Sequence, residues 1–228
     1  MRRQTGALAC ARASFRSLEQ GGPALRTIAP VSKPRQERDD AEELALVERI
    51  RSGDQDAWSE LLEPYQDRLF AVCVRMVGDR EMAADLAQES MVRVIQRLDT
   101  FRGGSKLSTW MIRVTMNVCL SKLRSEKLRR HASLTPNNPS GEGDVRDFWT
   151  PESGEPSGHS RVELDEQRQR LSEALLRITA DQRAILILRD NRGLDYEQIA
   201  EVLGVAVGTV KSRLFRARNA LRNAIEEQ

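Results

Sequence analysis

The chain has 228 residues, of which 39% are apolar and only 4% aromatic, with 36 basic and 34 acidic side chains. This length suggests one or two domains, and the abundance of Leu, Ala, Arg and Glu favours helices over a sheet-rich fold. The formal net charge of +2 excludes no class of partner, so the distribution of charge along the chain is the informative quantity.

The three cysteines, Cys10, Cys73 and Cys119, are far apart and odd in number, and they form no CxxC pair. This pattern indicates neither a disulfide framework nor a zinc site, so we expect no metal, no cofactor and a reducing cytoplasmic location. The two histidines, His131 and His159, join no Cys/His cluster, so we expect no catalytic residues. No apolar run approaches the ~18 residues that span a bilayer, so we expect no membrane insertion.

Residues 1–40 contain Arg, Gly and Pro without a hydrophobic period, and Glu19 is the only acidic residue before Glu37. A disordered extension, an over-long gene start and a transit peptide all fit this composition. Helical patterns follow: Gly53 and Gly78 are placed to end helices, and Asp79 to cap the next one. Pro64 is expected to begin a new helix, since its missing N–H costs little there.

A longer helix is expected from about residue 107 to 130, after which the composition changes. Residues 133–166 hold eight acidic side chains against Arg146 and Arg161, with many Pro, Gly and Ser. Such a run without a hydrophobic face predicts a flexible linker. We therefore expect an all-α protein with two helical domains joined by a flexible acidic linker. The expected segments are an extension (1–40), a first domain (41–132), the linker (133–166) and a second domain (167–228).

The second domain ends in "LDYEQIAEVLGVAVGTVKSRLFRARNALR". Asp195 and Gln198 form a capping-box pattern, Gly204 makes a tight turn, and a second helix is expected from Val207. Two short helices joined by a Gly turn, the second one basic, are typical of a helix-turn-helix. Its outward face would carry Lys211, Ser212, Phe215 and Arg216 toward DNA bases, with Arg213, Arg218 and Arg222 placed for phosphates. The alternative is a basic face that merely contacts solvent.

Two segments of the first domain carry unusual polar patterns. In "DLAQESMVRVIQRLDTF", the residues Asp85, Gln88, Glu89, Arg93 and Gln96 share one helix face, where i,i+4 pairs on a solvated surface are the alternative explanation. "FRGGSKLSTWMIRVTMNVCLSKLR" combines a Gly-rich loop and an aromatic residue with a basic helix that offers Arg and Asn. This combination suits single-stranded nucleic acid, and a core helix with a basic outer face is the alternative.

Together, these segments and the helix-turn-helix resemble the bacterial extracytoplasmic-function sigma factors, small members of the sigma-70 family. The resemblance covers about residues 42–131 and 167–226. It implies a non-catalytic specificity subunit of RNA polymerase that recognises and melts promoters to start transcription at a specific regulon. The implied partners are core polymerase, through its β′ clamp helices and β flap, and promoter DNA. The resemblance also implies an anti-sigma factor as a candidate partner and a location at the nucleoid for the active protein.

The resemblance also assigns roles to matched positions. The "DLAQE" helix is expected to contact the β′ clamp helices through Asp85, Gln88, Glu89 and Arg93. The residues expected at the minus-ten element are Phe101, Arg102, Ser105, Lys106, Arg113, Asn117 and Arg124. Those expected at the minus-thirty-five element are Lys211, Ser212, Arg213, Phe215, Arg216 and Arg218. The competing functions are a stand-alone helix-turn-helix regulator, which leaves the basic and aromatic loop unexplained, and a nucleotide-processing enzyme.

Overall fold

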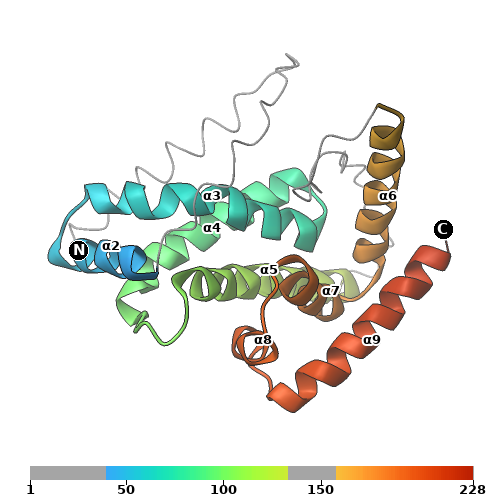
Figure 1. Ribbon diagram of the computed structural model, residues 1–228. Helices are drawn as coiled ribbons and strands as arrows, with labels where there is room; N and C mark the ends of the chain where they lie inside the picture. Colours follow the sequence, from blue (N-terminus) through green and yellow to red (C-terminus); the bar gives the residue numbers. More distant parts are fainter. Residues whose placement is uncertain (1–39, 133–157, 228) are drawn as a thin grey trace.

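The computed structural model describes residues 40–132 and 158–227, and all regular structure in these ranges is helical (Figure 1). The all-α prediction is therefore confirmed for the described residues. The expected N-terminal extension, apart from Asp40, and most of the expected linker lie outside them. The first domain consists of α2 (Asp40–Ser52), α3 (Asp56–Val77), α4 (Arg80–Arg97), a 3-10 turn (Leu98–Thr100) and α5 (Leu107–Ala132). The second consists of α6 (Gly158–Arg177), α7 (Ala180–Leu186), a π-helical turn (Ile187–Asn191), α8 (Tyr196–Leu203) and α9 (Val207–Glu226).

In the first domain, local signals fix the boundary between α3 and α4. Gly78 ends α3 with a left-handed φ of 78°, and its N–H donates to the carbonyl of Val74. The Asp79 side chain then accepts a hydrogen bond of 2.7 Å from the backbone N–H of Met82, which caps α4. Both predictions for this turn are confirmed. The three helices α3, α4 and α5 pack side by side around apolar residues such as Leu69, Met91 and Met111.

The predicted break at Pro64 is wrong, because α3 runs uninterrupted through it. Proline inside a helix removes one hydrogen bond and typically costs ~3 kcal/mol. Here Leu61 and Tyr65, on either side of Pro64, are buried in the same core cluster as Leu69, which lies one turn later. A continuous helix keeps all of these side chains on the buried face, so packing outweighs the local penalty.

The second domain begins earlier than its hydrophobic pattern predicts, because α6 starts at Gly158 rather than near Gln167. Its later helices follow local signals. The capping box of Asp195 and Gln198 is present, and Gly204 ends α8 with a φ of 65°. The second helix of the helix-turn-helix starts at Val207, so this prediction is confirmed.

The two domains pack against each other. One hydrophobic cluster includes Met76 and Met116 of the first domain together with Ile185 and Ile199 of the second. In Figure 1, α8 lies beside α5, between α5 and the N-terminal end of α9. Apolar surface near the C-terminal end of α3 and in the middle of α5 is buried by this contact, which stabilises the packed arrangement.

A buried arginine fastens the two domains together. The side chain of Arg183, on α7, is 6% exposed, and its guanidinium donates hydrogen bonds to backbone carbonyls of both domains. The acceptors are Met76 of α3, Leu175 at 2.7 Å, Leu176 at 2.9 Å and Ile178 at 3.2 Å. Burial lowers the pKa of Arg183 to about 10, so the side chain is still cationic at neutral pH.

Two of the widely spaced cysteines meet in the core of the first domain. Cys73 on α3 and Cys119 on α5 are both fully buried, and their Sγ atoms lie 3.7 Å apart as free thiols. Contact with Cys119 and burial raise the pKa of Cys73. The Cys73 thiol is therefore protonated, and both buried cysteines pack as small apolar residues.

Candidate nucleic-acid interface

The polar face of α4 lies on the surface of the first domain. Asp85 and Glu89 are exposed, while Gln88 and Arg93 are half-buried. Glu89 accepts a hydrogen bond from Arg93 across one helical turn. The opposite face carries Leu86, Met91 and Val94 into the core, so amphipathic spacing alone directs the predicted docking residues outward.

The loop between the 3-10 turn and α5, residues 101–106, is held from the side by α2. Arg51 donates a hydrogen bond of 2.5 Å to the carbonyl of Phe101, and Lys106 Nζ lies 3.4 Å from Asp40 Oδ2. Gly103 takes a left-handed φ of 71°, which lets the loop turn back toward α5. Contacts with α2 therefore hold the loop in a defined conformation.

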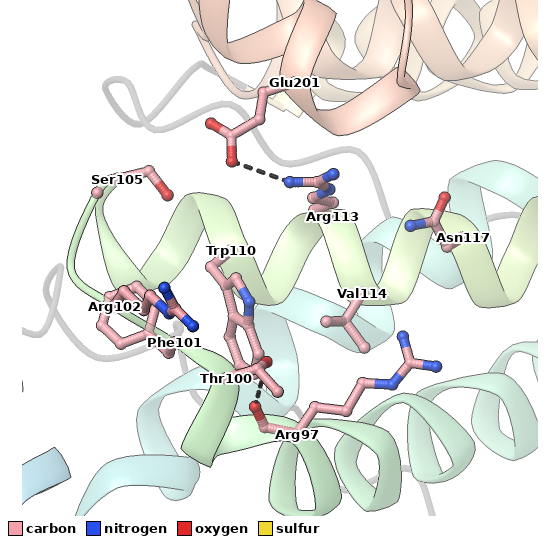
Figure 2. Close-up of a pocket in the computed structure, with 11 residues that line it drawn as sticks. Arg97, Thr100, Phe101, Arg102, Ser105, Trp110, Arg113, Val114, Asn117 and Glu201 are labelled. Atoms are coloured by element: carbon pink, nitrogen blue, oxygen red, sulfur yellow. Dashed lines mark hydrogen bonds and ion pairs between the residues drawn. The ribbon is translucent and has the colours of Figure 1, made fainter.

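A cleft of about 620 Å³ opens between this loop, the end of α4 and α5 (Figure 2). Its lining includes Phe101, Arg102, Ser105, Arg113 and Asn117 from the expected minus-ten set, together with Arg97, Thr100, Gly104, Trp110, Val114 and Glu201. Lys106 and Arg124, the other two residues of the expected set, do not line the cleft. Its guanidinium, hydroxyl and amide groups are those that donate hydrogen bonds to phosphates and bases.

Two aromatic rings form the floor of the cleft. Phe101 is only 4% exposed and packs in the core, with its ring centroid 5.6 Å from that of Trp110. Trp110 is half-buried, and its indole stands between Arg113 above and Thr100 below in Figure 2. Trp110 therefore offers the accessible aromatic surface, and Phe101 supports it from the core side.

Three residues of the lining, Arg97, Thr100 and Trp110, are not among the site residues predicted from the sequence. The signal for Trp110 was available, because residues 110, 113 and 117 follow an i, i+3, i+7 spacing that puts Trp110 on the face of Arg113 and Asn117. Arg97 and Thr100 come from the end of α4 and the 3-10 turn, and only the tertiary packing of α4 against α5 brings them to the cleft.

The expected strand-holding arginines are engaged by the second domain. Arg113 Nη1 lies 2.9 Å from Glu201 Oε1 of α8, as the dashed line in Figure 2 shows. Further along α5, Arg124 Nη2 lies 3.3 Å from Asp181 Oδ1 of α7. All four side chains keep substantial exposure, between 42% and 66%.

The outer face of α9 is a separate basic surface. Lys211, Ser212, Arg213, Phe215, Arg216 and Arg218 are all exposed. The predicted inward residues Val210, Leu214 and Ala217 are buried, so the outward orientation of the expected base-reading set follows from the helix period. Phe215 is 67% exposed, which is costly in water but suited to contact with a thymine methyl group. Arg218 also pairs with Asp190 at 2.6 Å, and this hydrogen bond raises the pKa of Arg218.

Among the described residues, no helix has the length and apolar character required to cross a membrane. Within the same ranges, no three His, Cys, Asp or Glu side chains gather where they could hold a metal ion.

Comparison with known proteins identifies both domains. Residues 61–129 match the family described as Sigma-70 region 2, and residues 168–221 match Sigma-70, region 4. RNA polymerase sigma-H factor of Pseudomonas aeruginosa is 34% identical over 185 residues, which is 79% of this chain and 92% of that protein. The ECF RNA polymerase sigma-E factor of Escherichia coli K12 is 33% identical and SigW of Bacillus subtilis 30%, each over 79% of this chain. These matches cover 95% of SigW and 93% of the sigma-E factor.

Solved structures of sigma factors also align with this chain. The sigma factor RpoE of Bartonella quintana, in complex with the anti-sigma factor NepR, aligns with a TM-score of 0.55 at 27% identity, covering 74% of this chain and 96% of that one. CnrH, in complex with the cytosolic domain of CnrY, has the same fold, with a TM-score of 0.54 at 20% identity over 83% of this chain and 99% of that one. The order of the two matched regions, the identity over most of the chain and the shared fold place this chain in the sigma-70 family, as an extracytoplasmic-function RNA polymerase sigma factor.

Proposed function

We propose that three surfaces of the chain divide the steps of promoter recognition. The polar face of α4, with Asp85, Gln88, Glu89 and Arg93, docks on the β′ clamp helices of core polymerase. The α5 cleft receives the melted minus-ten strand. The outer face of α9, with Lys211, Ser212, Arg213, Phe215, Arg216 and Arg218, reads the minus-thirty-five element while the second domain contacts the β flap.

The cleft on α5 is the observation that carries this proposal. It places an accessible indole (Trp110), an exposed side-chain amide (Asn117) and a guanidinium (Arg113) around a volume of about 620 Å³. An unstacked base can stack on an aromatic ring and bond to an amide, while the backbone pairs with positive charge. A volume of this size also lies within the ordinary range of sites that bury a small ligand.

The remaining partners follow from membership of the family. The chemistry of RNA synthesis belongs to core polymerase, and we expect no catalytic activity from this chain. Its place of action is the nucleoid in the cytoplasm. Because the similar RpoE structure contains the anti-sigma factor NepR, we also expect a cognate anti-sigma factor to bind this chain.

The test of the cleft is Asn117→Ala in holoenzyme reconstituted with bacterial core polymerase. Asn117 is exposed on α5 and lines the cleft, so truncation removes an amide from the proposed base site without disturbing the core. A lost hydrogen bond of ~1–1.4 kcal/mol predicts about a five- to tenfold fall in promoter opening. Permanganate reactivity of thymines in the melted region measures opening, and co-elution measures polymerase binding.

Ser121→Ala is the matched control, since Ser121 is exposed one turn further along α5 and outside the cleft lining. We expect it to open promoters at the rate of the unchanged protein. If Asn117→Ala lost polymerase binding and opening together, or matched Ser121→Ala in both assays, the proposed role of Asn117 would be wrong.

A further inference from the structure

Helix α2 presents two adjacent faces to the rest of the first domain. One face is apolar and packs in the core, with residues such as Val47, which is 1% exposed. The other face carries Asp40, Leu44 and Arg51, whose separations of four and seven residues place them on one side of a helix. All three of these residues are exposed, so burial in the core does not account for their positions.

Arg51 holds the first residue of the loop 101–106. Its Nη2 donates a hydrogen bond of 2.5 Å to the carbonyl of Phe101, 50 residues later in the chain. Its Nη1 lies 2.6 Å from Glu48 Oε1 on the same helix, and this ion pair orients the guanidinium. Because a peptide unit is planar, the bond to the Phe101 carbonyl also fixes the next Cα atom, that of Arg102.

Two weaker contacts hold the rest of the loop against α2. Leu44 Cδ2 lies 3.6 Å from the position that a Cβ atom on Gly103 would take, which is van der Waals distance. Lys106 Nζ lies 3.4 Å from Asp40 Oδ2, and an ion pair between side chains this exposed contributes little. The bond from Arg51 is charge-assisted and partly buried, so it is the strongest of the three contacts.

The loop residues between these contacts face the cleft. Arg102, Gly104 and Ser105 belong to its lining, and Figure 2 shows Ser105 at one end of the cleft and Asn117 at the other. Groups that recognise a ligand have to be held within about 0.5 Å of their productive geometry by the residues behind them. For the loop, α2 supplies this support.

We propose that Arg51 is a positioning residue for minus-ten recognition: it fixes the Phe101 carbonyl and thereby sets where Arg102 and Ser105 stand in the cleft, and so which minus-ten bases the holoenzyme prefers. This inference rests on the proposed role of the α5 cleft. Arg51 is not among the residues that line the cleft, so it acts through the loop. Base preference then depends on a helix that belongs to none of the three proposed surfaces.

Arg51→Ala in holoenzyme reconstituted with bacterial core polymerase tests this proposal. The readout is a discrimination ratio: the opening rate on a promoter that the holoenzyme uses, divided by the rate on copies with single base changes in the minus-ten element. Permanganate reactivity measures both rates. A loss of folded protein lowers both rates by the same factor, so a merely structural role of Arg51 leaves the ratio unchanged.

Arg49→Ala is the matched control on the same helix. Arg49 is exposed and pairs with Asp54 at 2.7 Å and with Glu60 at 2.9 Å, so the substitution also removes ion pairs of α2 but no contact with the loop. We expect Arg51→Ala to lower the ratio about three- to tenfold, as the loss of one hydrogen bond allows, and Arg49→Ala to leave it unchanged. Both variants should co-elute with core polymerase as the unchanged chain does.

A loop variant that combines Arg102→Ala with Ser105→Ala shows whether Arg51 acts through these side chains. In this background, Arg51→Ala should change the ratio by less than about twofold, because the groups that Arg51 positions are gone. If the effects of the loop variant and of Arg51→Ala multiplied in full, the two would act independently and the inference would be wrong.

An unchanged ratio for Arg51→Ala, or an equal fall for Arg49→Ala, would also overturn the inference. The loop variant alone separates this failure from that of the proposed function. If the loop variant lowers the ratio while Arg51→Ala does not, the loop reads the minus-ten element and only the role of Arg51 is wrong. If the loop variant leaves the ratio unchanged, the proposed reading of the minus-ten element by the loop fails as well.

Discussion

Arg183 shows how one side chain joins two domains that the sequence separates by a linker. Its acceptors, Met76, Leu175, Leu176 and Ile178, lie at or just beyond the C-terminal ends of α3 and α6. Carbonyls at helix C-termini carry partial negative charge, so a cation is favourable there even without a carboxylate. A buried guanidinium satisfied in this way is expensive to remove, because the carbonyls around it lose their donors together.

Arg183→Leu is therefore expected to destabilise the free chain by about 3 kcal/mol or more in urea unfolding. Arg177→Leu is the matched control, since Arg177 is exposed and donates only a long bond of 3.4 Å to Ala224. We expect that control to change stability by less than about 0.5 kcal/mol. Similar losses for the two variants would show that the carbonyl cluster does not depend on Arg183.

At the scale of helices, local chemistry predicted most elements and tertiary packing decided the exceptions. Interactions within a few residues form the turn at Gly78 and Asp79 and the capping box at Asp195 and Gln198. The sequence pattern was therefore sufficient to predict both features. The prediction that a new helix begins at Pro64 is wrong, because the burial of Leu61 and Tyr65 in one core outweighs the local cost of a proline inside a helix. The first turns of α6, from Gly158, show no hydrophobic periodicity, so the sequence pattern did not predict them.

Two glycines at helix ends allow the free-energy cost of the domain contact to be measured by substitution. Gly78 and Gly204 both end helices with left-handed φ, at 78° and 65°. A Cβ atom would meet Leu176 at Gly78 but open space at Gly204. We expect Gly204→Ala to cost ~1 kcal/mol from backbone strain and Gly78→Ala ~1–3 kcal/mol more from the clash, both measured by urea unfolding.

Leu176→Ala provides the background for this comparison. When Leu176 is shortened, Gly78→Ala should cost about as much as Gly204→Ala, because only backbone strain is left. If Gly78→Ala and Gly204→Ala were equally costly in the unchanged chain, Leu176 would not press on the end of α3 in solution.

At the scale of the whole molecule, the sequence predicted the two domains and their outward faces but not their contact. Phe215 and Arg216 were predicted on the exposed face of α9, and Asn117 near Arg113 on α5, because each set obeys a helix period. The pairing of Arg113 with Glu201 joins residues 88 positions apart, and Arg183 reaches Met76 across 107 positions. Neither residue type nor spacing marks such pairs, so they are visible only in the folded chain.

The most direct test of the sigma-factor account is run-off transcription with bacterial core polymerase, with and without this chain, on a cognate promoter. The account predicts specific initiation only when chain and core are combined, and weak binding of promoter duplex by the chain alone. The contradicting result is a chain that fails to co-purify with core polymerase and binds duplex DNA at nanomolar concentration by itself.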